Sequence, residues 1–81
     1  MNKRMIENKQ AFIAALSIAL RELDAQRTNV KSIKLEVMPS LVPDAYEEQI
    51  RIEFLHGGVR TIPASGNSNL ANMLAIAKAL L

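Results

Sequence analysis

The sequence has no cysteine and a single histidine, His56, among its 81 residues. A disulfide and a thiolate metal site are therefore excluded, and one imidazole cannot build a histidine-rich metal site. Aromatic residues make up only 4% of the chain, with no tryptophan, so few side chains could form a stacking platform for single-stranded RNA. From these absences we expect neither a bound metal nor a cofactor.

A strong charge of either sign is also missing. Ten Lys and Arg residues oppose eight Asp and Glu residues, and the net charge is +2. Such a balance permits nucleic-acid binding without requiring it. Hydrophobic residues make up 49% of the sequence, mostly Ala, Ile, Leu and Val, which favours a folded chain over a disordered one. The length predicts a single domain over residues 1–81, with a core so small that a partner would help to stabilise it.

No apolar run reaches the roughly 18 residues that a membrane span needs. Lys3 and Arg4 precede the apolar run from Ala11 to Leu20, an order that resembles a secretory signal peptide. Glu7 in the basic segment and a charged cluster after the run argue against that interpretation. We therefore expect no membrane contact and a cytoplasmic location, since a chain without cysteine suits a reducing compartment.

The apolar spacing predicts an α+β fold. Residues from about 3 to 26 contain no Pro or Gly and read as one long helix. Alternating apolar residues over 33–37 and 50–54 predict two strands, and Gly57-Gly58 predicts a hairpin into a short third strand that ends at Pro63. A second helix follows the turn over 65–69. We expect the order α-β-β-β-α, with a two- to three-stranded antiparallel sheet and both helices on one of its faces.

This arrangement predicts a core made of three groups of side chains. The first helix supplies a stripe, the two main strands supply their apolar faces, and the last helix closes the core. The residues are Phe12, Leu16, Leu20, Leu23, Ile33, Leu35, Val37, Ile50, Ile52, Phe54, Leu70, Leu74 and Ala77.

The register of the third strand has two solutions. A two-residue turn pairs Phe54 with Thr61, and a three-residue loop pairs Ile52 with Ile62. We favour the longer loop because it keeps Ile62 on the apolar face, and a slip of one residue would reverse every side chain.

The first helix has a second apolar face, about 180° from Leu16, made of Ala11, Ala14, Ala15 and Ile18. Alanine is the best helix former, so this face could be exposed with no further role. It could also be covered within one chain by the sheet or the last helix. We favour a third explanation, in which the four residues form the interface of a homodimer, because small residues let two helices approach closely and a two-fold contact uses one patch twice.

We find no catalytic constellation. His56 lies at the predicted hairpin tip, with no nucleophile beside it in the sequence. Glu47 and Glu48 are adjacent, so a strand would point them to opposite faces, and we interpret both as solubilising charges. The segment from Ser65 to Asn69 reads as a turn and helix cap. The sequence therefore predicts a protein that is not an enzyme.

The element order resembles that of the double-stranded-RNA-binding domain, over most of the chain. That family carries Gly-x-Ser before its last helix, which Gly66-Asn67-Ser68 matches, and then a pair of phosphate-binding lysines. Asn69 and Leu70 stand where those lysines would be. The resemblance implies an alternative function in nucleic-acid binding, for which the nearest basic cluster is Arg27, Lys31 and Lys34. Our leading prediction is a small non-enzymatic module that binds proteins, above all a second copy of itself.

Overall fold

The computed structural model describes residues 3–43 and 45–81, and of residues 23–28 it describes the backbone alone. The elements are α1 (Lys3–Thr28), β1 (Val30–Pro39), β2 (Tyr46–Phe54), β3 (Val59–Pro63) and α2 (Asn69–Leu80). The predicted order α-β-β-β-α is therefore confirmed. Asn29 separates α1 from β1 with a φ of 59°, a left-handed conformation that Asn tolerates better than most residues.

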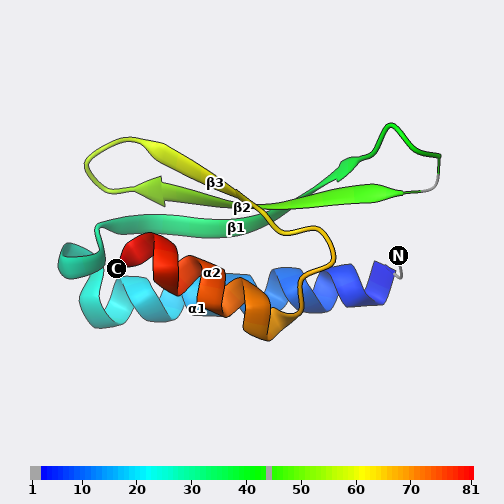
Figure 1. Ribbon diagram of the computed structural model, residues 1–81. Coiled ribbons are helices and arrows are strands. Elements are labelled where there is room, and N and C mark those ends of the chain that lie inside the picture. Colours follow the sequence, from blue (N-terminus) through cyan, green and yellow to red (C-terminus); the bar gives the residue numbers. More distant parts are fainter. Residues whose placement is uncertain (1–2, 44) are drawn as a thin grey trace.

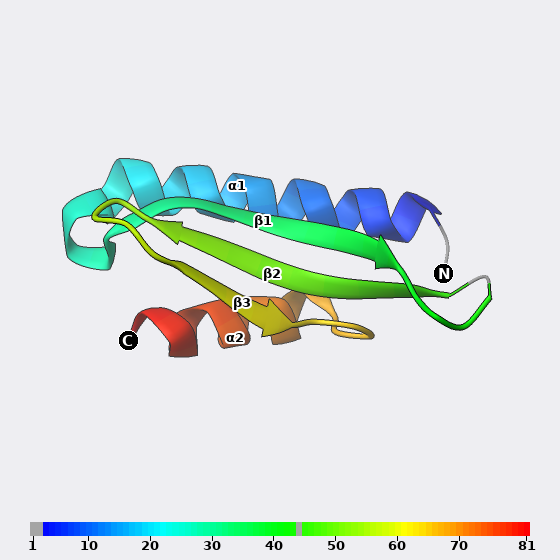
Figure 2. The same cartoon turned by 90° about the horizontal axis from the view of Figure 1, so that it is seen from above.

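The three strands form one antiparallel sheet in the order β1-β2-β3. Both helices cover the same face of this sheet and run in the same direction, with α1 along β1 and α2 on the side of β3 (Figures 1 and 2). The result is two layers, one of strands and one of helices. The predicted placement of both helices on one face agrees with this arrangement.

The register of β3 differs from both predicted solutions, since Ile52 lies opposite Arg60 and Ile62 opposite Ile50. The turn explains the difference. Gly57 N donates to Phe54 O at 3.2 Å, and Phe54 N donates to Gly58 O at 3.1 Å. Gly57 has a φ of 93°, the left-handed glycine of a three-residue loop that begins with a type I turn. The favoured register is wrong by two residues, so Ile62 still keeps its predicted face and packs against the core.

The core agrees with the prediction for the sheet and differs for the helices. Ile33, Leu35, Ile50 and Ile52 are buried. The predicted residues Phe12, Leu16, Leu20, Val37 and Phe54 are half-buried and pack against them. Ile13, which is not among the predicted core residues, is fully buried. The side chain of Leu23 lies outside the described residues.

The predicted closure of the core by Leu70, Leu74 and Ala77 is wrong, because all three are exposed. The side of α2 that faces the core carries Asn72 and Ile76, which are both buried. On α1 the residues that face the core and are buried in the same way are Lys9, Ile13 and Ser17. Polar side chains thus hold several of the buried positions on the two helices, and the apolar residues Leu70, Leu74 and Ala77 of α2 lie on its exposed side.

Polar side chains of α1 bond to the backbone of β1. Ile33 N donates to Ser17 Oγ at 2.9 Å, and Gln10 Nε2 donates to Leu35 O at 3.4 Å. Both backbone groups belong to β1, an edge strand of the sheet. Side chains of α1 therefore bond to backbone groups that β2 does not pair.

Candidate functional site

The predicted second face of α1 is exposed. Ala11, Ala14, Ala15 and Ile18 are all accessible, and Ile18 exposes 57% of its surface. The alternative in which the sheet or α2 covers this face within one chain is therefore wrong for the described residues. The face lies free on the surface, as a contact with another molecule requires.

A second apolar surface lies on α2. Leu70, Met73, Leu74 and Leu81 are exposed, with 61% of Leu70 and 53% of Leu74 accessible. Ala77 is exposed beside them. We call these five residues the α2 stripe. Single exposed apolar residues are common on soluble proteins, but several on one side of one helix suggest an interaction site.

Both surfaces point away from the sheet. Ala15 is two residues from the buried Ile13 and two from the buried Ser17, so at about 100° per residue it lies opposite the core. Leu74 is likewise two residues from the buried Asn72 and two from the buried Ile76, so it also lies opposite the core. Since both helices cover one face of the sheet (Figure 1), the exposed face of α1 and the α2 stripe lie on the helical layer, on its free side.

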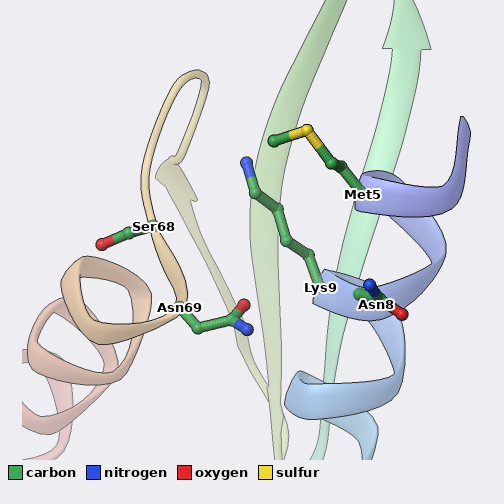
Figure 3. Close-up of a pocket in the computed structure, with 5 residues that line it drawn as sticks. All are labelled: Met5, Asn8, Lys9, Ser68 and Asn69. Carbon is green, nitrogen blue, oxygen red and sulfur yellow. The ribbon is translucent and has the colours of Figure 1, made fainter. Parts of the chain in front are cut away.

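A depression lies between the N-terminal ends of the two helices. Met5, Asn8, Lys9, Ser68 and Asn69 line it, with a volume of about 260 Å³. Figure 3 shows Met5 and Lys9 reaching from α1 and Asn69 extending toward α1 from the opposite side, while the hydroxyl group of Ser68 points away. Ser68 Oγ accepts from Ala71 N at 3.2 Å, which confirms the predicted helix cap.

Lys9, which lines this depression, forms a buried ion pair with Glu48. Lys9 Nζ lies 3.3 Å from Glu48 Oε1, with 10% of the Lys9 side chain and none of the Glu48 side chain accessible. Gly66 N donates to the other carboxylate oxygen at 3.4 Å. Our interpretation of Glu48 as a solubilising charge is therefore wrong, whereas Glu47 is exposed as expected. The group ties α1, β2 and the turn before α2 together.

The remaining candidate residues do not form a site. His56 is exposed in the hairpin loop. Among the described residues no group of three or more His, Asp or Glu side chains is placed to hold a metal ion.

Two of the basic residues of the alternative function, Lys31 and Lys34, are exposed on β1. Lys34 is exposed opposite Arg51, whose guanidinium Nε lies 3.4 Å from Glu53 Oε1 and 4.0 Å from Glu36 Oε1. Lys31 is exposed at the irregularity in β1 between Val30 and Ser32. The side chain of Arg27 lies outside the described residues. The first turn of α2 adds no Lys or Arg.

Comparison with protein families, with curated proteins and with solved structures finds no match to this chain. No helix among the described residues has the length and apolar character to cross a membrane. What the chain does must therefore be inferred from its own surface.

The α2 stripe and Glu48 are the two features that sequence reasoning missed. For Glu48 a signal was present, because residues 48, 50 and 52 share one face of a strand and the last two were predicted to be buried. Because α2 is apolar on most sides, the helical periodicity of its apolar residues could not distinguish its buried side from its exposed side.

Proposed function

We propose that this protein is a small non-enzymatic interaction module that works as a homodimer through the helical layer. The observation that carries the proposal is the exposure of the α1 face, Ala11, Ala14, Ala15 and Ile18, on a helix whose opposite side is buried. A cytoplasmic location belongs to the same proposal, because a chain without cysteine suits a reducing compartment.

Two physical arguments support self-association. A domain of this length buries a limited share of its surface, so apolar contacts between copies would add stability that the core alone supplies poorly. The small side chains of the α1 face also allow close approach of another helix, and a two-fold contact lets the same face serve both subunits.

The substitution Ile18→Glu tests this proposal. It places a charge on the largest side chain of the α1 face, where burial between two subunits would be poorly tolerated, and we expect a folded monomer by sedimentation and circular dichroism. Thr61→Glu is the matched control, since it adds the same charge at an exposed position of β3. A concentration-independent monomer for the unmodified protein would contradict the proposal.

A further inference from the structure

Four of the five residues of the α2 stripe recur at spacings of four, three and four along the helix. They are Leu70, Leu74, Ala77 and Leu81. At about 100° per residue they fall in one narrow strip, on the side opposite the buried Asn72 and Ile76. Leu81 N donates to Ala77 O at 3.1 Å, which keeps Leu81 on the path of the helix. Alternating spacings of four and three are those of the seam between two packed helices, so the α2 stripe has the form of a surface that receives another helix.

The lack of charge on α2 restricts the kind of molecule that this surface fits. Lys78 is the only charged residue of α2, and the exposed residues around it are apolar. Nucleic-acid binding needs several Lys or Arg contacts to phosphate. Helices that lie on a membrane surface are typically rich in Lys and Arg as well. The chemistry of the α2 stripe therefore suits an apolar helix of a protein partner.

A second copy of the chain presents such a helix without electrostatic repulsion. A two-fold contact sets a surface against itself, so a surface with charges of one sign repels its own copy. The α2 stripe has no charged residue. On α1, Arg4 and Glu7 lie at one end of the exposed face and Arg21 and Glu22 lie at the other, so both signs are present at each end. The free side of the helical layer is therefore compatible with a copy of itself.

The size of the two exposed surfaces favours the same partner. A standard interface involves about 20–30 residues from each side, and the four residues of the α1 face cannot supply that number. The helices α1 and α2 lie side by side in one layer (Figures 1 and 2), and the α2 stripe is exposed on the same free side. It also carries larger side chains, such as Leu70 and Leu74. A contact that covers both helices comes closer to the area that a stable dimer needs.

We propose that the α2 stripe is a helix-docking surface and that its occupant is the α2 stripe of a second copy of this chain. This inference rests on the proposed function and deepens it, because it adds α2 to an interface that the α1 face is too small to form alone. The leucines supply most of the apolar area, and the small side chain of Ala77 lets the two helices approach closely. Two copies thus meet helical layer to helical layer, with their sheets on the outside.

The substitution Leu74→Glu tests the docking surface. Leu74 exposes 53% of its surface in the single chain, so we expect the variant to stay folded by circular dichroism. Its dissociation constant should rise about a hundredfold, because the new charge would be buried between two subunits. Val59→Glu is the matched control, since Val59 on β3 exposes 50% of its surface, and its dissociation constant should stay within about twofold of the unmodified value. Sedimentation equilibrium measures both.

Spin labels give a second measurement that does not depend on dissociation. Because the chain has no cysteine, Ala77→Cys and Thr61→Cys each introduce one thiol that a nitroxide label can modify. Both positions are exposed, one on α2 and one on β3. In a contact between helical layers the two labels on α2 lie close to the interface, so electron spin resonance should give a shorter distance for the Ala77 pair than for the Thr61 pair. The reverse order would place the sheets at the interface and overturn the inference.

The outcomes separate this inference from the proposed function. Dissociation by Leu74→Glu but not by Val59→Glu would support the docking of α2 on α2. If Ile18→Glu dissociates the dimer and Leu74→Glu leaves it intact, the inference is wrong while the proposed function stands. If the unmodified protein is a monomer at all concentrations, both are wrong. Binding of that monomer to phosphatidylcholine vesicles, lost in Leu74→Glu, would assign the α2 stripe to a lipid surface instead.

Discussion

Lys9 Nζ and Glu48 Oε1 lie 3.3 Å apart between the first helix and the central strand. The two charges have unequal access to water. The Glu48 side chain is fully buried, whereas Lys9 keeps 10% of its side chain accessible and lines an open depression. Removing one partner leaves the other uncompensated, and the cost depends on whether the remaining charge can reach water.

We therefore predict that Lys9→Met destabilises the protein more than Glu48→Gln does. Lys9→Met leaves a buried carboxylate, and we expect a loss of about 3–5 kcal/mol in the free energy of unfolding. Glu48→Gln leaves an ammonium group that can turn toward the depression, at a cost of about 1–3 kcal/mol. Urea unfolding measures both, with Glu47→Gln on the exposed neighbour as the control. The opposite order would show that Glu48, and not Lys9, reaches solvent.

At Asn72, in contrast, we predict a substitution that stabilises the protein. Its side chain is fully buried, and neither Nδ2 nor Oδ1 has a hydrogen-bond partner among the described residues. An unsatisfied buried amide costs free energy that an apolar side chain of similar size avoids. Asn72→Leu should raise the free energy of unfolding by about 1–3 kcal/mol. Asn72→Asp keeps the shape, adds a charge, and should destabilise the protein. A loss of stability in Asn72→Leu would mean that the amide has a bonded partner, such as water.

Two isoleucines on α1 provide a matched comparison of its two sides. Ile13 is fully buried and Ile18 exposes 57% of its surface. Ile13→Ala should cost about 2–5 kcal/mol of stability, while Ile18→Ala should stay within about 0.5 kcal/mol for the dissociated monomer. Thermal unfolding at low protein concentration measures both. Equal losses would contradict the orientation of α1 described above.

Nucleic-acid binding is the prediction on which the alternative function depends. We expect no submicromolar binding to duplex RNA or DNA at physiological salt, because the three basic residues Arg27, Lys31 and Lys34 would make few phosphate contacts, and few such contacts give weak affinity. Fluorescence anisotropy over a salt series measures this. Tight binding that disappears when Arg27, Lys31 and Lys34 are neutralised would favour the alternative instead.

The sheet and the order of elements could be predicted because strand alternation leaves few choices. Apolar residues alternate with polar ones along these strands, and this period of two predicts that Ile33, Leu35, Ile50 and Ile52 share the buried face of the sheet. The buried sides of the helices were harder to predict, since α2 is apolar on most sides and its buried side includes the polar residue Asn72. Ser17 and Lys9 are buried because they bond to Ile33 N and Glu48, which lie 16 and 39 residues away along the chain, and no local pattern reports such partners.

The hairpin turn between β2 and β3 shows a second limit of prediction from the sequence. Gly57-Gly58 predicted a hairpin correctly, but the register depended on which glycine takes the left-handed position of the loop. Gly57 and Gly58 both have positive φ, so the sequence alone allows several loops. Of the two exposed apolar surfaces, the α1 face was recognised in the sequence because Ile18 stands out among alanines, whereas residues of the α2 stripe were predicted to be core.

The hydrogen bonds from Ser17 and Gln10 to β1 also limit how the protein can polymerise. A sheet grows when an incoming strand pairs with free backbone groups at its edge. Here the Ile33 N–H and the Leu35 carbonyl are already bonded to α1, and the other edge strand is short and ends at Pro63, which has no N–H to donate. Fibre formation by strand addition is therefore opposed at both edges, so that copies of the chain can crowd together without their sheets merging.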